Sequence, residues 1–247
     1  MGEQIQILKL DATDSTNLHL KRLLLSEDLE DYTTIVAKKQ LKGRGQMGTV
    51  WQSEEGKNLT FSVLKNHGFL DVNDQFILNI CVSLSIYDVV QGLSLPDLKV
   101  KWPNDIMSGS SKICGILIEN VLKGLAIKNS IIGVGLNVNQ TSFENLDKVA
   151  SLKSISGKLF DLDELLNKIL ESFKFYFLEL EKEKNTEMIS QYEQLLFRKD
   201  KPSTFRDTTN TMFMGFIRGV STDGKLVVEL EDNILKTFGL KEITLLY

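Results

Sequence analysis

The sequence predicts a mixed α+β fold, with one large domain over residues 1–199 and a small β module over residues 200–247. Two observations indicate this division. Up to about residue 200, segments with strand-like patterns interleave with segments whose apolar residues recur at helical spacing. Beyond Pro202, only short apolar runs separated by turn residues remain, which is typical of strands. A length of 247 residues suits a large domain accompanied by a small one.

Six segments of the large domain are predicted to be strands. The alternation of apolar and polar residues at 5–10 suits a half-buried strand, and the β-branched residues of 33–38 favour another. The other four are apolar runs that end at turn residues, at 59–64, 98–101, 113–121 and 125–138. Gly-Ser-Ser at 109–111 is expected to form a turn between two of them.

Four segments keep the helical spacing of apolar residues. Leucines between residues 18 and 25 mark an amphipathic helix, which Asp14 or Ser15 would cap. Residues 73–90 are apolar at helical spacing and predict a long, buried helix. The last two helices are expected at 163–182 and 186–198.

The C-terminal module is predicted to hold three strands, at 212–220, 226–230 and 234–238. Asp223-Gly224 separates the first two of these apolar runs and is a strong hairpin signal. Glu231-Asp232-Asn233 provides the next turn.

Charge and cysteine content exclude several classes of protein. The 29 basic residues against 33 acidic residues give a net charge of −4, so no global basic field for nucleic acid is present. The 2 cysteines are too few for a disulfide framework or a zinc site. No apolar run reaches the length of about 18 residues that a membrane helix needs, and the N-terminus lacks a secretory signal. We therefore expect a cytoplasmic protein.

The segment 40–48 is the first candidate for chemistry. Gly43, Gly45 and Gly48 surround Arg44. Glycines let a ligand approach the backbone and present successive N–H groups to an anion, and arginine adds a rigid charged fork for carboxylate or phosphate. A flexible surface turn explains the same spacing about equally well, because G-x-G patterns are common.

Three further features favour an anion-binding cleft. Trp51 follows the loop and would cover a flat ring, although a core tryptophan is the alternative. Lys101-Trp102-Pro103-Asn104-Asp105 gathers a cation, an amide and a carboxylate directly after a strand. Lys112 lies near Gly115, and Gly133-Val134-Gly135-Leu136-Asn137 ends a strand with small residues. Each feature alone also fits a structural role, but together they predict a cleft for a negatively charged, partly flat ligand.

Other kinds of catalytic site fit less well. The 2 histidines, His19 and His67, form no persuasive catalytic triad or metal site. The phosphate-binding motif G-x-x-x-x-G-K-[ST] is missing. The third glycine of a dinucleotide fingerprint is missing as well.

In their order along the chain, these segments resemble the motifs of biotin protein ligases. The set is Ser15-Thr16-Asn17, Gln40-x-x-Gly43-Arg44-Gly45-x-x-Gly48-x-x-Trp51, Lys101-Trp102-Pro103-Asn104-Asp105, Lys112-Ile113-Cys114-Gly115-Ile116-Leu117, Gly133-Val134-Gly135-Leu136-Asn137, and a closing β module with Gly215 and Asp223-Gly224. The resemblance covers nearly the whole chain. It implies a catalytic domain with a class II aminoacyl-tRNA-synthetase-like mixed sheet and a C-terminal SH3-like β-barrel.

The resemblance also implies a reaction in two steps. ATP, with Mg²⁺, activates the biotin carboxylate to biotinyl-5′-AMP, and a lysine of a biotin carboxyl carrier domain then attacks the anhydride. Bringing a carboxylate to a triphosphate sets two anions against each other, so the site needs cations and oriented N–H donors. Arg44, Lys101 and Lys112 match this need and are implied as catalytic residues.

Ligand contacts follow from the resemblance by position. The implied biotin contacts are Ser15, Thr16, Asn17, Gln40, Gly43, Arg44, Gly45, Gln46, Lys112, Gly115, Gly133 and Gly135. The implied contacts to ATP and the adenylate are Arg44, Trp51, Lys101, Asn104, Lys112 and Asn137, with Trp51 stacking on adenine. Asp105 is implied as the contact to Mg²⁺, with Asn104 left as the other choice.

The sequence departs from many relatives at Gln46 and Thr49, where those relatives carry arginines, so a weaker hold on the adenylate is expected. Only 14 residues precede Ser15, which is too few for the DNA-binding winged helix of bifunctional members. A monofunctional ligase that does not bind DNA is therefore expected.

Two alternatives stay open at this point. A lipoate–protein ligase shares the fold and the adenylate chemistry, but the full KWPND pattern and the C-terminal module disfavour it. A non-catalytic ligand-binding regulator would be expected to lose Arg44 or Lys112, and both are present. A homodimer also stays open, because members of such families dimerise through sheet edges, and the sequence does not identify the carrier.

Overall fold

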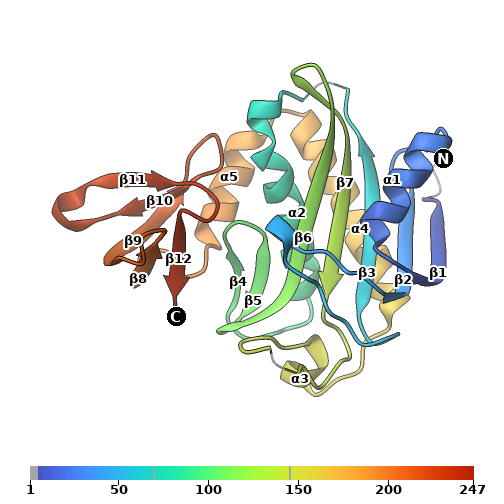
Figure 1. Ribbon diagram of the computed structural model, residues 1–247, viewed down its shortest axis with the longest axis horizontal. Helices are drawn as coiled ribbons and strands as arrows, with labels where there is room; N and C mark the ends of the chain where they lie inside the picture. Colours follow the sequence, from blue (N-terminus) through green and yellow to red (C-terminus); the bar gives the residue numbers. More distant parts are fainter. Residues whose placement is uncertain (1–4, 69, 145) are drawn as a thin grey trace.

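The computed structural model describes residues 5–68, 70–144 and 146–247. Its strands form a seven-stranded mixed sheet and a separate five-stranded sheet, which lie side by side in Figure 1. Among the described residues, no helix is both long and apolar enough to cross a lipid bilayer.

The large sheet has the strand order β1-β2-β3-β7-β6-β5-β4. Its strands are β1 (Ile7–Thr13), β2 (Thr34–Gln40), β3 (Leu59–Asn66), β4 (Leu98–Lys101), β5 (Asp105–Ser108), β6 (Ser111–Lys123) and β7 (Ala126–Leu136). The pair β1–β2 is parallel, because helix α1 (Thr16–Ser26) connects the two strands as a crossover. The remaining neighbours are antiparallel.

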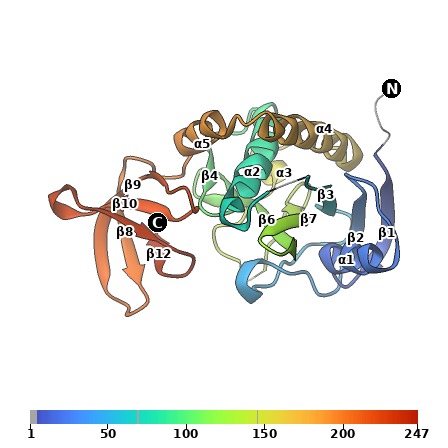
Figure 2. The same cartoon turned by 90° about the horizontal axis from the view of Figure 1, so that it is seen from above.

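Helices cover both faces of this sheet (Figure 2). Helix α2 (Phe76–Gln91), α4 (Leu162–Glu181) and α5 (Asn185–Gln194) lie on one face. Helix α2 is apolar all round, and 12 of its 16 residues are buried, because it packs against the sheet on one side and against α4 and α5 on the other. A short helix, α3 (Leu152–Ser156), follows β7 and begins with a capping box at Ser151.

Helix α1 covers the opposite face and encloses a second, smaller core. Leu20 of this helix packs with Ile35, Leu64 and Ile131 of the sheet, and all four are buried. This packing fixes the N-terminal end of α1 above the centre of the sheet. The polar residues at that end are therefore held in place by an apolar contact a turn away.

The C-terminal sheet is antiparallel, with the order β11-β10-β9-β8-β12. Its strands are β8 (Pro202–Asp207), β9 (Met212–Val220), β10 (Leu226–Glu229), β11 (Leu235–Phe238) and β12 (Ile243–Leu246). The rings of Phe205, Phe213 and Phe238 stack inside it. The module is attached to the large sheet where Trp102 Nε1 donates to the carbonyl oxygen of Gly224 over 2.9 Å.

The predicted α+β class is confirmed, with a large mixed sheet and a small antiparallel one. The sequence patterns missed β5, β8, β12 and α3, of which β5, β12 and α3 are too short for a period to be read.

The predicted helix 186–198 was wrong at its C-terminal end. Helix α5 ends at Gln194, because the following residues pair with the exposed edge of β4 instead. Phe197 N donates to the Val100 carbonyl over 2.8 Å, and Val100 N donates to the Leu195 carbonyl over 2.9 Å. This pairing satisfies backbone groups that an edge strand would otherwise leave open.

The attachment of the C-terminal module depends on the absence of a side chain at Gly224. This residue has φ +82°, and a Cβ there would lie 2.2 Å from Cγ of Phe76. We predict that Gly224→Ala lowers the free energy of unfolding by the left-handed backbone cost of about 1–2 kcal/mol plus an overpacking cost of about 1–3 kcal/mol.

Urea unfolding of Gly109→Ala provides the matched control. Gly109 also has a positive φ, +57°, but nothing lies within 4 Å of its missing Cβ. This variant should pay the backbone cost alone. Equal losses in the two variants would mean that the contact with Phe76 contributes nothing.

Candidate active site

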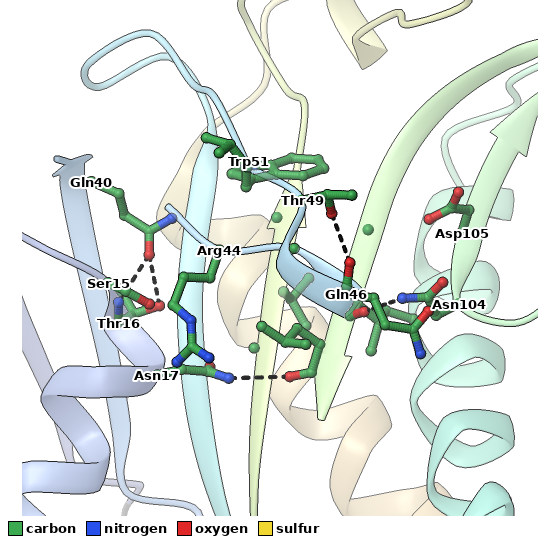
Figure 3. A pocket seen from close by; sticks show the side chains of 18 of the residues that line it. Ser15, Thr16, Asn17, Gln40, Arg44, Gln46, Thr49, Trp51, Asn104 and Asp105 are labelled. Carbon is green, nitrogen blue, oxygen red and sulfur yellow. Dashed lines mark hydrogen bonds between the residues drawn. The ribbon is translucent and has the colours of Figure 1, made fainter. Parts of the chain in front are cut away.

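A cavity of about 270 Å³ lies over the centre of the large sheet. Its walls come from the start of α1, the end of β2, the hairpin 43–51 and strands β5, β6 and β7 (Figure 3). The structure brings together most of the predicted site residues here, namely Ser15, Thr16, Asn17, Gln40, Arg44, Gly45, Gln46, Trp51, Asn104, Asp105, Lys112, Gly115, Gly133 and Gly135. Gly43, Lys101 and Asn137 lie outside this wall.

Paired glycines form the floor of the cavity. Gly115 on β6 and Gly135 on β7 are direct cross-strand partners. A Cβ at Gly135 would lie 2.3 Å from Cε2 of Trp51, and one at Gly115 would lie 2.9 Å from Cζ3 of the same ring. The indole of Trp51 therefore lies against bare backbone. Glycine is required at both positions by this close approach and not by its backbone angles.

Trp51 is not part of the apolar core. It belongs to neither cluster of buried hydrophobic residues, and its Nε1 is buried without a hydrogen-bond partner among the described residues. An unpaired buried donor costs about 1–3 kcal/mol. The absence of Trp51 from both clusters contradicts the alternative of a core tryptophan.

One end of the cavity is lined by polar side chains from the first turn of α1 and from Gln40. Gln40 Oε1 accepts hydrogen bonds from the Thr16 backbone N at 2.9 Å and from Thr16 Oγ1 at 3.2 Å. Ser62 Oγ, buried on β3, lies 2.7 Å from Thr16 Oγ1 and 2.6 Å from Asn17 Oδ1. These contacts fix the side chains of the first turn of α1 before any ligand arrives. Ser62 belongs to none of the sequence motifs, so its place beside the site was not predicted.

Ser15 stands at the N-cap position of α1 but makes no side-chain capping hydrogen bond. Asp14 does not cap the helix either, since its Oδ1 accepts from the Ser15 backbone N at 2.8 Å. The predicted N-cap position at Ser15 is confirmed, but the side-chain hydrogen bond of a cap is not formed. Ser15 lines the cavity instead.

Two cations, Arg44 and Lys112, line the cavity, and each is paired with a carboxylate of the protein. Lys112 Nζ lies 2.6 Å from Asp105 Oδ1. Arg44 Nη1 lies 3.3 Å from Glu119 Oε1, and Glu119 Oε2 accepts from Asn17 Nδ2 at 2.9 Å. Glu119 therefore bridges Arg44 and Asn17, and Arg44 lies beside the first turn of α1 (Figure 3).

Sequence reasoning missed Glu119. It belongs to no motif, yet it follows Gly115 on β6 by four residues. Residues at even spacing along a strand share one face, so this register was the signal that would have placed Glu119 beside the cavity.

The hairpin 43–51 forms the lid of the cavity. Gly45 N donates to the Thr49 carbonyl over 2.7 Å, and Trp51 N donates to the Gly43 carbonyl over 3.0 Å. A Cβ at Gly43 would lie 2.2 Å from the Trp51 carbonyl oxygen, so glycine is needed there for the hairpin to close. The segment predicted as a loop thus has its own backbone hydrogen bonds.

Asn104, Asn137 and Lys101 are each held by a contact with another residue of the protein. Asn104 is buried, and its Nδ2 donates to the Ile116 carbonyl at 2.5 Å. Asn137 is buried outside the cavity, and its Nδ2 donates to the Ala150 carbonyl at 3.1 Å. Lys101 Nζ lies 5.1 Å from the ring centroid of Tyr247, and burial is the main cause that lowers the pKa of this lysine.

Comparison with known proteins gives consistent relatives. The chain matches the model of the Biotin/lipoate A/B protein ligase family over residues 10–137. It is 30% identical to the bifunctional ligase/repressor BirA of Bacillus spizizenii, over 87% of this chain and 67% of that protein. It is 32% identical to the biotin–[acetyl-CoA-carboxylase] ligase of Paracoccus denitrificans, over 52% of this chain and 53% of that protein.

Solved structures agree in fold. The biotin protein ligase from Aquifex aeolicus in complex with biotin and ATP superposes with a TM-score of 0.80 and 27% identity, covering 97% of this chain and 98% of that one. The biotin protein ligase from Leishmania major in complex with biotin gives a TM-score of 0.64 at 19% identity, covering 97% and 99%.

The contact between Trp51 and the glycine floor generates a prediction. Gly135→Ala should displace the indole, because the new Cβ would lie 2.3 Å from Cε2. In a Trp102→Phe background, in which Trp51 is the single tryptophan, the fluorescence emission should shift to longer wavelength as the ring enters water. Gly68→Ala, where nothing lies within 4 Å of the missing Cβ, is the control. An unchanged spectrum in Gly135→Ala would contradict this placement of the ring.

Proposed function

Because the chain belongs to the biotin/lipoate A/B protein ligase family, we propose from that premise that it is an ATP-dependent biotin protein ligase. It activates biotin to biotinyl-5′-AMP and then transfers biotin to a lysine of a biotin carboxyl carrier domain. The observation that carries this function is the layout of the cavity (Figure 3). Polar side chains around Thr16 and Asn17 lie at one end with Arg44 beside them, and Lys112 lies with Asp105 at the other end, across a floor of glycines.

The first step, adenylate formation, needs the positive charges of the cavity. A biotin carboxylate oxygen attacks the α-phosphorus of ATP, the bond from that phosphorus to the bridging oxygen breaks, and pyrophosphate leaves. Both reactants are anions, so fixed positive charge at their meeting point lowers the barrier. We assign this role to Lys112 and Arg44, which exchange their pairing with Asp105 and Glu119 for pairing with the reacting groups.

The second step uses the same layout. The carrier lysine amine attacks the carbonyl carbon of the mixed anhydride and forms an amide bond. The bond from that carbon to the phosphate oxygen breaks, AMP leaves with its electron pair, and the amine loses a proton to the solvent. The hairpin 43–51 forms the lid of the cavity. Excluding water protects the anhydride from hydrolysis until the carrier arrives.

The polar end favours biotin over lipoate. The head group of biotin is a cyclic urea with two N–H donors and one carbonyl acceptor, whereas the dithiolane of lipoate offers no comparable groups. Ser15, Thr16, Asn17 and Gln40 line this end and supply hydroxyl and amide partners. A site built with polar groups rejects a ligand that leaves them unpaired.

Trp51 suits the adenine ring. Its indole belongs to the hairpin 43–51, lies against the glycine floor and lines the cavity. Stacking of a base on an aromatic side chain is worth about 1–3 kcal/mol. We propose that Trp51 stacks on adenine.

The residues present fit Mg²⁺ that arrives with ATP. The described part of the chain contains no group of three or more His, Cys, Asp or Glu placed to share a metal ion, whereas Asp105 contributes one carboxylate to the cavity wall. Mg²⁺ at nucleotide sites is typically held by one or two carboxylates together with substrate phosphates and water. Mg²⁺ would neutralise phosphate charge there, and Asp105 would be its protein ligand.

The domain organisation completes the proposal. We place the catalytic domain at residues 1–199 and an SH3-like barrel at 200–247. The five-stranded sheet that begins with β8 at Pro202 supports this boundary. The carrier domain would approach the cavity from its open side.

Biotin-dependent exchange of pyrophosphate into ATP tests the function. Exchange should require biotin and should stay at background with lipoate. Lys112→Ala should reduce it about a hundred- to thousandfold, because removing one such electrostatic contact typically costs about 2.7–4 kcal/mol. Lys112→Arg, which keeps the charge, should recover part of the rate.

Lys123→Ala is the matched control, since Lys123 lies at the exposed far end of the same strand. Circular dichroism checks that each variant is folded. Exchange driven by lipoate instead of biotin would overturn the assignment of the substrate. Exchange within about threefold of wild type in Lys112→Ala would overturn the role of this lysine.

A further inference from the structure

Three lysines gather at the edge of the cavity, around the ring of Tyr247. Lys148 Nζ lies 4.2 Å from the ring centroid, and Lys101 Nζ lies 5.1 Å from it. The backbone places the third lysine beside them, because Lys112 N donates to the Lys148 carbonyl over 2.8 Å. The sequence motifs included Lys101 and Lys112 but gave no reason to notice Lys148 or Tyr247.

Among the described residues, one carboxylate side chain, that of Asp105, is paired with these three lysines. Asp105 is paired with Lys112 at 2.6 Å. Within the described ranges, neither Lys101 nor Lys148 has an ion pair with an acidic side chain; each has the Tyr247 ring as its neighbour. Burial is the main cause that lowers the pKa of Lys101; the negative charge of Asp105 opposes this effect, and the positive charge of Lys112 adds to it. A half-buried ammonium without an anion is costly, so the cluster is suited to an anionic ligand.

We propose that this lysine cluster, Lys101, Lys112 and Lys148, binds the β,γ-diphosphate of ATP and the pyrophosphate that leaves from it. The inference rests on the proposed function and deepens it. Lys112 belongs both to the cluster and to the cavity wall. An anion bound to the cluster would therefore lie next to the place where the biotin carboxylate meets the α-phosphate. Lysine ammonium groups bind phosphate as compact point charges.

The size of the cluster favours a small polyanion over an acidic protein surface. Two ammonium groups share one aromatic ring within 4.2 and 5.1 Å, and Lys101 is half-buried behind it. A pyrophosphate carries several charges on adjacent oxygens and reaches such a recess. The carboxylates of a docking protein are spread over a wider surface and lie on longer side chains.

Tyr247 acts as a positioning residue for the lysine cluster. It follows β12, which pairs with β8 in the C-terminal module, and its ring packs edge-on against Phe197 with centroids 5.0 Å apart. A cation over an aromatic face is held by the ring quadrupole. The C-terminal module thereby takes part in binding the nucleotide.

Inhibition by pyrophosphate of biotin-dependent adenylate formation tests the proposal. In Lys148→Met, the inhibition constant of pyrophosphate and the KM for MgATP should both rise about five- to tenfold, because a charge-assisted contact is lost. The KM for biotin should not change. Lys148→Arg should stay close to wild type, and Lys158→Met, which removes an exposed lysine of the same region, should have no effect.

A second measurement separates the phosphate from the carrier. Transfer of biotin from synthetic biotinyl-5′-AMP to a carrier domain bypasses pyrophosphate, so Lys148→Met should leave it unchanged. Unchanged pyrophosphate inhibition in Lys148→Met would overturn the proposal. A raised KM for the carrier together with unchanged pyrophosphate inhibition would also overturn it and would assign the lysines to docking.

A binding experiment distinguishes failure of this inference from failure of the proposed function. Calorimetric binding of inorganic tripolyphosphate to the full chain needs neither biotin nor turnover. Binding that weakens in Lys148→Met supports the lysine cluster even if wild type shows no biotin-dependent exchange. Binding that is equal in both proteins contradicts it.

Discussion

The contact between the Trp51 indole and the bare backbone of Gly115 and Gly135 is the constraint on which the cavity depends. A Cβ at either glycine would overlap the ring, so the paired glycines let the hairpin 43–51 lie directly on the sheet. That approach brings Arg44 within 3.3 Å of Glu119 on β6. The lid, the floor and one of the two cations are therefore positioned by the same close packing.

Both cations of the cavity are held by carboxylates of the protein, Lys112 by Asp105 and Arg44 by Glu119. These pairs keep the two cations in position. We propose that an anionic substrate displaces the two carboxylates and pairs with the cations in their place. Both pairs are partly exposed, and such pairs are worth about 0.2–1 kcal/mol. The cavity would select anionic ligands by this exchange.

The sequence predicted the motifs better than their surroundings. Helix α2 and strands β6 and β7 are long and strongly patterned, so their existence follows from periodicity. Strand β5 has only four residues and gains its identity from pairing with β4 and β6, which no local pattern records. Glu119 and Lys148 reach the site through strand register and a backbone hydrogen bond. Such long-range placements are decided by tertiary structure.

The affinity of Glu119→Gln for biotin, compared with its affinity for the neutral alcohol analogue of biotin, tests the exchange of charge most directly. Glutamine keeps an acceptor for Asn17 Nδ2, which Glu119 binds at 2.9 Å, but no longer competes for Arg44. By calorimetry, the variant should bind biotin about two- to fivefold more tightly than wild type, in line with the value of a partly exposed ion pair, and should bind the alcohol with unchanged affinity. An equal change for both ligands, or a weaker affinity for biotin alone, would contradict the account.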